Sequence, residues 1–268
     1  MSRQGMMRLA SKAEGFRSRE RPAGGKGCSH GGAAAGSVSF RRSNMPPMRL
    51  TVLLLLITTA LYAQSAPDPT RFAAEIEAFA TADAVQPIAP GVILFVGSSS
   101  VRMWHSLQED LEGHRVLNRG FGGSQFADLI HYADRLIYPY RPRAVFVYEG
   151  DNDIAAGDSA RDVLRSAKKL RKMIAKNLSK DTPVVFISPK PSVARWELHR
   201  EYEKANDLLE AYAEKQKHTY FVDVWTPALL PDGTVRKDIF LADNLHMTAA
   251  GYDIWEAAIE PVVELLDR

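Results

Sequence analysis

The sequence has almost no cysteine. Its one cysteine, Cys28, precedes the part of the chain whose apolar pattern predicts a fold, so residues 67–268 have none. That part therefore contains no disulfide framework, no thiolate nucleophile and no cysteine-based metal site. About two hundred residues without disulfides must be stabilised by a hydrophobic core, and a hydrophobic content of 46% is ample for one.

The predicted domain also lacks an excess of positive charge. Residues 1–63 contain ten Lys or Arg and two Asp or Glu, so the net charge of +2 is unevenly distributed. The remaining 24 basic and 30 acidic residues give residues 64–268 a net charge of −6. Nucleic-acid binding needs a basic face or stripe, so no nucleic-acid partner is expected.

The apolar segment near the N-terminus is too short to span a membrane. Residues 50–61 make twelve apolar or small positions, against the ~20 that a spanning helix needs. A short positive start precedes them, and Ala63 and Ala66 follow at suitable cleavage positions. This is the pattern of a signal peptide over residues 45–66. It predicts a bacterial protein exported to the periplasm or secreted, without stable membrane insertion after cleavage, and an uncleaved anchor is the alternative.

The first 44 residues have no apolar periodicity. Residues 1–44 are rich in Arg, Gly, Ser and Ala, which predicts disorder or a mis-assigned leader, with Met45 or Met48 as the true start. Residues 67–268 show no internal repeat and no second zone of composition. We therefore expect one domain over 67–268.

Apolar strand patterns alternate with helical patterns throughout this domain. Strands are predicted over residues 92–96, 115–118, 143–148, 183–188 and 219–224. Helices are predicted over residues 69–84, 101–111, 124–138, 159–178, 197–217 and 249–266. Such alternation indicates parallel βαβ units and a three-layer α/β/α sandwich.

Polar segments follow three of the strands. They are 97–100, 120–124 and 150–153, and a fourth polar segment, 243–246, precedes the last helix. Loops that leave parallel strands lie on one edge of the sheet, where open α/β sheets bind ligands. Serine, glycine, asparagine, aspartate and histidine are therefore expected to meet there.

These residue types suit acyl transfer, which needs a nucleophile, a base, a group that holds the base, and oxyanion donors. Ser99 is the candidate nucleophile, His246 the base and Asp243 its partner. The backbone N–H groups of Ser99 and Gly123 and the side-chain amide of Asn152 are the candidate oxyanion donors.

Each of these candidate residues and polar segments has another interpretation. Ser99 and its neighbours can simply begin a helix, Asp243 can cap the last helix, and His246 can be a surface histidine. Gly120-x-Gly122 lacks the third glycine of a dinucleotide fingerprint. The aspartates of 151–158 lack the spacing of a calcium loop and are interpreted as turn and cap residues. No metal site is predicted.

The four segments together resemble the SGNH branch of the GDSL-type serine esterases and lipases. The first block usually reads Gly-Asp-Ser and is Gly97-Ser98-Ser99 here; the others are Asn118 to Gly123, Gly150-Asp-Asn152 and Asp243-Asn-Leu-His246. The resemblance implies a flavodoxin-like five-stranded sheet of order 2-1-3-4-5. It also implies a triad of Ser99, Asp243 and His246, oxyanion donors at Gly123 and Asn152, and no cofactor.

The predicted function is an exported serine hydrolase of short-acyl carboxylic esters, for example an O-acetyl group on a carbohydrate. Four residues are candidates for substrate contact: Trp104 and Trp196 by stacking on a sugar, and Lys190 and Arg195 by meeting an anion. Packing is the alternative for both tryptophans, and simple solvation for both cations. A thioesterase or lysophospholipase using the same site, and a catalytically silent carbohydrate-binding domain, are the rival functions. The oligomeric state is not predicted.

Overall fold

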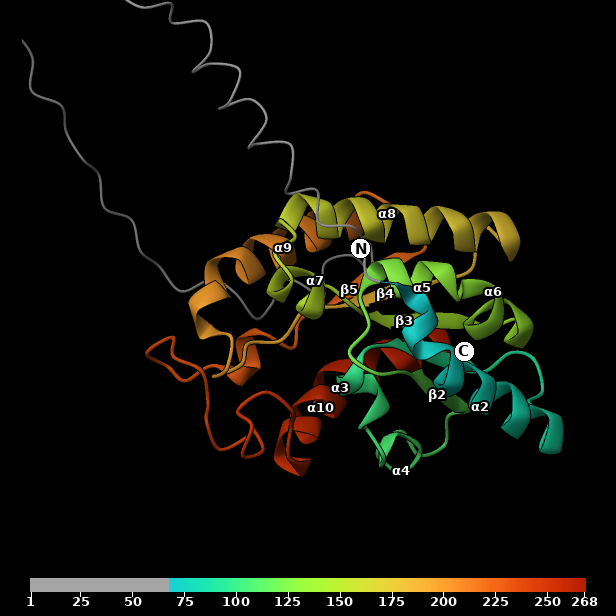
Figure 1. Ribbon diagram of the computed structural model, residues 1–268, viewed down its shortest axis with the longest axis horizontal. Helices are drawn as coiled ribbons and strands as arrows, with labels where there is room; N and C mark the ends of the chain where they lie inside the picture. Colours follow the sequence, from blue (N-terminus) through green and yellow to red (C-terminus); the bar gives the residue numbers. More distant parts are fainter. Residues whose placement is uncertain (1–67) are drawn as a thin grey trace, which may run out of the picture. The chain divides into compact units, whose positions relative to one another are not determined.

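The computed structural model describes residues 68–268, and the predicted leader and signal peptide lie outside the described residues. Five parallel strands form one sheet in the order β2-β1-β3-β4-β5, which confirms the predicted fold (Figure 1). The strands are β1 Ile93–Gly97, β2 Val116–Gly120, β3 Ala144–Tyr148, β4 Val184–Ile187 and β5 Thr219–Val222. Because β2 and β3 lie on opposite sides of β1, the topological switch point falls between β1 and β3.

Helices cover both faces of this sheet. The α-helices of four or more residues are α2 Ala73–Val85, α3 Ser99–Arg102, α4 Leu107–Asp110, α5 Phe126–His131, α6 Ala133–Leu136, α7 Asp151–Ala155, α8 Ala160–Asn177, α9 His199–Ala213 and α10 Ala249–Leu266. Helices α2, α5, α6, α8 and α9 pack on one face, and α3, α4 and α10 pack on the other. None of the helices between residues 68 and 268 is long and apolar enough to cross a membrane.

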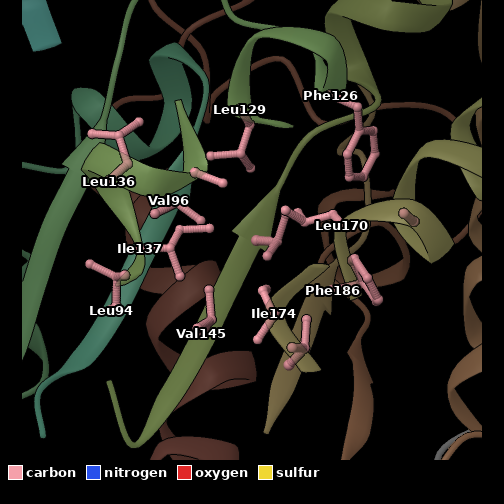
Figure 2. Packing of buried hydrophobic residues seen from close by; sticks show 14 of the residues in the cluster. Leu94, Val96, Phe126, Leu129, Leu136, Ile137, Val145, Leu170, Ile174 and Phe186 are labelled. Atoms are coloured by element: carbon pink, nitrogen blue, oxygen red, sulfur yellow. The ribbon is translucent and has the colours of Figure 1, made fainter. Parts of the chain in front are cut away.

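Strand β1 shows why the sheet is buried on both sides. All five of its residues are buried, and side chains alternate between the faces of a strand. Leu94 and Val96 join the core beneath α5, α6 and α8, part of which is drawn in Figure 2. Ile93 and Phe95 join the core beneath α3 and α10. A continuous apolar run is what two covered faces require.

The largest differences from the sequence prediction concern three helical segments. The helix predicted over 101–111 is two short helices, because Asn118 Nδ2 donates to the carbonyls of Val101 (2.6 Å) and Trp104 (3.3 Å) and ends α3 there. The helix predicted over 124–138 is likewise divided into α5, α6 and a short 3₁₀ turn that contains Pro139. Helix α7 is absent from the prediction, since five residues are too few to show an apolar period.

Candidate active site

Ser99 stands at the carboxyl end of β1 as the first residue of α3. Gly97 makes this turn possible: its φ is +137°, and a Cβ there would lie 2.0 Å from the carbonyl oxygen of Tyr148. Only glycine allows the strand to leave the sheet so close to β3. Ser98, where the resemblance expects aspartate, is buried at 1% exposure and begins α3 as its N-cap residue.

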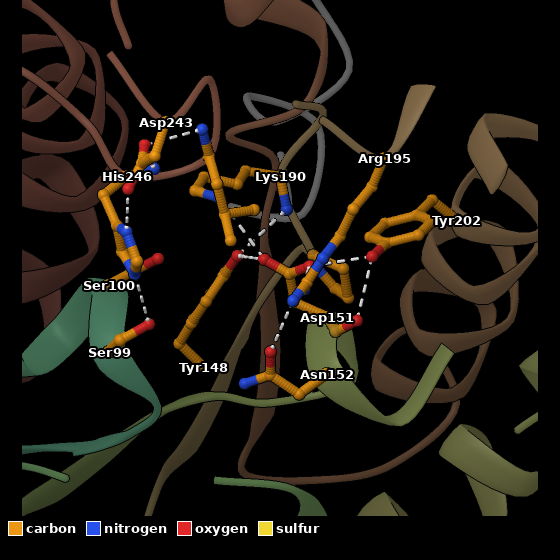
Figure 3. Close-up of polar contacts among 12 residues, drawn as sticks. Ser99, Ser100, Tyr148, Asp151, Asn152, Lys190, Arg195, Tyr202, Asp243 and His246 are labelled. Atoms are coloured by element: carbon orange, nitrogen blue, oxygen red, sulfur yellow. Dashed lines mark hydrogen bonds and ion pairs between the residues drawn. The ribbon is translucent and has the colours of Figure 1, made fainter. Parts of the chain in front are cut away.

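His246 reaches Ser99 from the other end of the chain. Its Nε2 lies 3.0 Å from Ser99 Oγ, although 147 residues separate the two. Its Nδ1 lies 2.6 Å from Asp243 Oδ2, so the three side chains form one row (Figure 3). The other carboxylate oxygen of Asp243 accepts the backbone N–H groups of Leu245 and His246, both at 3.0 Å. These bonds fold residues 243–246 into the tight turn that the spacing of Asp243 and His246 predicts.

The charge of Asp243 decides which nitrogen of His246 carries the proton. Hydrogen bonds from His246 and from two backbone N–H groups lower the pKa of Asp243 to about 2. An ionised carboxylate only accepts hydrogen bonds, so Nδ1 of a neutral His246 must donate to it. Nε2 is then an acceptor for the Ser99 hydroxyl, which is the arrangement a general base needs.

The candidate oxyanion donors surround the same serine. Among residues 68–268, no backbone oxygen accepts a hydrogen bond from the N–H of Ser99 or Gly123. A Cβ on Gly123 would lie 3.8 Å from Asn152 Nδ2, so the glycine and the amide are neighbours. Asn152 follows β3 in the first turn of α7, and in Figure 3 its amide nitrogen points to the Ser99 side. Ser99 and Asn152 thus flank the switch point of the sheet.

Helix α2 and the residue before it hold the segment that carries Gly123. Glu75 Oε2, from α2, accepts the N–H of Gly122 at 3.0 Å. Phe72 packs against the same glycine so closely that a Cβ there would lie 2.1 Å from its ring. Sequence reasoning missed Glu75, because no spacing links a residue of α2 to a loop 47 residues later.

Two of the four residues predicted to contact substrate are buried. Trp104 is 1% exposed and packs in the core against Phe95 and Trp255, with its Nε1 donating to Asp110 at 2.6 Å. The packing alternative therefore describes the Trp104 ring. Lys190 is 2% exposed and pairs with Asp151 at 3.3 Å, so it meets neither solvent nor an anionic substrate.

The other two lie nearer the surface. Trp196 is half-buried and stacks with His199 and Trp225, so its contact with a sugar stays a prediction. Arg195 is 20% exposed in its side chain, but its guanidinium donates to Asp151 and to Asn152 Oδ1 instead of pointing outward. The structure therefore gives Arg195 partners within the site.

Asp151 is the main residue of the site that sequence reasoning misjudged. It is buried and accepts hydrogen bonds from the hydroxyls of Tyr148 and Tyr202, each at 2.7 Å. It also forms ion pairs with Lys190 and Arg195. Burial alone would raise its pKa, but the two cations and the two hydroxyls outweigh burial and hold the pKa well below its usual range. Two cations in the loop after β4, facing a carboxylate after β3, are the signal that would have predicted this cluster.

Asp153 does have the capping role expected of it. Its carboxylate accepts the N–H groups of Gly150 (3.0 Å) and Phe126 (3.1 Å) and ties α7 to α5. Burial raises its pKa to about 7. Within residues 68–268, no three His, Cys, Asp or Glu side chains are grouped to hold a metal ion.

Sheet order and site together define a class of protein: an α/β/α hydrolase with serine, histidine and aspartate in a row at the carboxyl edge of its sheet. The model of the GDSL-like lipase/acylhydrolase family matches residues 88–254. The chain belongs to this family, which confirms the resemblance and the prediction of an ester-hydrolysing enzyme.

Solved structures share the fold at low sequence identity. A protein proposed to be a platelet activating factor from Streptococcus pneumonia has a TM-score of 0.64 at 19% identity, covering 80% of this chain and 99% of its own. A GDSL-like lipase from Bacteroides thetaiotaomicron scores 0.60 at 20% identity, covering 71% and 97%. An acetylxylan esterase from Geobacillus stearothermophilus scores 0.53 at 15% identity, covering 66% and 95%. The search of curated proteins found no match.

Proposed function

We propose that this protein is an exported serine esterase that cleaves short-acyl carboxylic esters through an acyl-enzyme on Ser99. The observation that carries the proposal is the row of Ser99, His246 and Asp243, with separations of 3.0 and 2.6 Å. A nucleophile within hydrogen-bond reach of a base, which is in turn held by a third group, is the geometry of nucleophilic catalysis.

The reaction follows from this row. His246 Nε2 takes the proton of Ser99 as Oγ attacks the ester carbonyl, and the imidazolium that forms is stabilised by Asp243. The same proton then passes to the leaving alcohol as the tetrahedral intermediate collapses to the acyl-enzyme. Water, deprotonated by His246, attacks the acyl carbonyl. The protonated His246 then gives this proton to Ser99 Oγ as the second tetrahedral intermediate collapses, which releases the acid and restores Ser99 and neutral His246.

The negative charge of each tetrahedral intermediate needs donors already in place. The N–H groups of Ser99 and Gly123 and the Nδ2 of Asn152 come from the ends of three neighbouring strands, β1, β2 and β3. Such donors are worth most when they do not have to reorient during the reaction, and loss of one typically costs ~3–4 kcal/mol of transition-state stabilisation.

The substrate proposal rests on a cavity whose walls are not uniformly apolar. A cavity of about 430 Å³ borders the segment leading to Gly123, and its lining is mixed: Glu75, Arg102, His105 and Asn118 are polar or charged, whereas Ala78, Phe79 and Trp104 are apolar. A long acyl chain needs an apolar channel, whereas an O-acetyl group on a carbohydrate is compatible with polar walls. The acetylxylan esterase among the structural relatives supports the same choice. Export rests on the signal-peptide pattern of residues 45–66.

The experiment compares nitrophenyl acetate, butyrate and octanoate as substrates of the full-length protein and two serine variants. Ser99→Ala should lose at least roughly 10⁴-fold in kcat, because the variant has no nucleophile. Ser100→Ala is the matched control: this neighbouring serine is buried, and it is Ser99 Oγ that lies beside His246. Its kcat should stay within a few-fold of the wild type.

Two results would count against the proposal. Equal turnover by the wild type and Ser99→Ala would remove the serine mechanism. A preference for octanoate over acetate would remove the short-acyl substrate and favour a lysophospholipase or a long-chain thioesterase at the same site.

A further inference from the structure

The side-chain amide of Asn152 is held in one orientation by two opposite partners. Its Nδ2 donates to the backbone carbonyl of Ser124 at 2.9 Å, and its Oδ1 accepts from Arg195 at 3.0 Å. A guanidinium only donates hydrogen bonds, so the oxygen of the amide must face Arg195. The nitrogen must then face the other way, and Figure 3 shows it pointing to the Ser99 side.

This orientation leaves one N–H for a ligand. An amide nitrogen carries two hydrogens, and Ser124 accepts one of them. If the amide turned over, a carbonyl oxygen would face the oxyanion and repel it. The orientation of Asn152 therefore decides whether this residue stabilises or opposes the transition state.

Arg195 is in turn fixed by a buried carboxylate. The guanidinium bridges Asp151 and Asn152, with one nitrogen on each. The Asp151 side chain is 5% exposed and is held by the Tyr148 and Tyr202 hydroxyls and by the Lys190 ammonium. Asp151 and the three residues that hold it come from β3, α7, α9 and the loop after β4. Buried residues of the domain therefore set the position of Arg195.

We propose that Arg195 is a positioning residue: it locks the Asn152 amide with Nδ2 toward the acyl carbonyl oxygen, and Asp151 holds it there. This inference rests on the proposed function, since it assigns Asn152 to the oxyanion. It gives Arg195 a role in catalysis that needs no contact with substrate.

The expected effect is smaller than the loss of Asn152 itself. Removing an oxyanion donor typically lowers kcat by about 10²–10³-fold. Without Arg195, Ser124 still favours the correct orientation, so Arg195→Ala should lower kcat by about 10–50-fold and leave KM within about three-fold.

The test is a double-mutant cycle on the full-length protein with nitrophenyl acetate. Arg195→Ala, Asn152→Ala and the double variant are compared, with Arg200→Ala, at an exposed arginine on α9, as the matched control. If Arg195 acts through Asn152, the double variant should equal Asn152→Ala within about two-fold. Arg200→Ala should match the wild type. Guanidinium chloride at millimolar concentration should restore part of the kcat of Arg195→Ala and none of Asn152→Ala.

A loss of folding is separated from a loss of positioning by a second variant. Arg195→Lys keeps a cation beside Asp151, but an ammonium is a point charge that does not bridge two acceptors in a fork. Its Tm should stay near that of the wild type while its kcat falls as in Arg195→Ala. The inference is overturned if Arg195→Lys keeps the wild-type kcat, or if the effects of Arg195→Ala and Asn152→Ala multiply. If one of these two results is found while Ser99→Ala is inactive, the positioning role of Arg195 fails but the serine mechanism stands. If Ser99→Ala is active, the serine mechanism itself fails.

Discussion

Replacement of Glu75 by alanine should weaken catalysis without touching the row of Ser99, His246 and Asp243. Glu75 accepts the N–H of Gly122, which immediately precedes Gly123, the proposed oxyanion donor. It belongs to α2, which ends at Val85, before the residues that match the family begin. A helix outside that match therefore contacts the loop of the site.

The magnitude follows from the exposure of the carboxylate. A hydrogen bond to a charged group contributes ~1.5–3 kcal/mol, but the Glu75 side chain is 36% exposed and solvent screening reduces this. A net ~1 kcal/mol of lost loop stability corresponds to a roughly five-fold fall in kcat if it all appears in the transition state. The same loss lowers Tm by about 2–4 °C in a domain of this size.

The assay is kcat for nitrophenyl acetate together with Tm by calorimetry. Glu77→Ala is the matched control: it lies on the same helix, is 68% exposed, and pairs with Arg135 away from the glycine loop. Glu75→Gln keeps an acceptor oxygen and should recover most of the activity. If Glu75→Ala and Glu77→Ala had the same kcat, the support of the loop by α2 would be refuted.

Three further predictions concern stability and the triad. Gly97→Ala would place a Cβ 2.0 Å from the Tyr148 carbonyl oxygen at a φ of +137°. The substitution should lower the free energy of unfolding by roughly 3 kcal/mol or more, which is measured as a fall in Tm. An unchanged Tm would contradict the account of this turn. Burial raises the pKa of Asp153 to about 7, so the folded state holds a proton that the unfolded state loses near pH 4. The contribution of Asp153 to the free energy of unfolding must therefore fall as pH rises from about 4 to 7. Asp153→Asn should remove up to about 4 kcal/mol of that pH dependence in urea titrations, and equal slopes for both proteins would be the contrary result. Asp243→Asn should favour the wrong tautomer of His246 and lower kcat by roughly 10³–10⁴-fold, and a variant keeping a tenth of the activity would argue against that role.

The sequence was enough to predict the strands and the edge at which the polar loops meet. An uninterrupted apolar run such as 92–96 has few structures open to it other than a strand covered on both faces, and parallel strands place their exit loops together. The proximity of Ser99, Gly123 and Asn152 follows from that topology. The turn that brings Asp243 to His246 follows from their spacing of three.

Side-chain partners across the sheet were beyond sequence reasoning. Asp151 and Arg195 are separated by 44 residues, and no periodicity relates them. Residue type alone predicts a turn aspartate at 151 and an anion-binding or solvated cation at 195, whereas in the fold the two side chains pair with each other. Asn118 ends a helix 14–17 residues before it by competing for backbone carbonyls, which no helical pattern encodes. The residue type of Trp104 does not reveal whether it packs in the core or contacts a ligand, and its place against Phe95 and Trp255 emerges only in the fold.

The central claim is that His246 activates Ser99 across 147 residues of sequence. Its most direct test is to treat the protein with a fluorophosphonate, which reacts with activated serines, and to locate the adduct by mass spectrometry of peptides. We predict one adduct per chain, on Ser99, and at least roughly a hundred-fold slower labelling in His246→Ala. Labelling of another serine, or equally fast labelling of Ser99 in the His246→Ala variant, would contradict the claim.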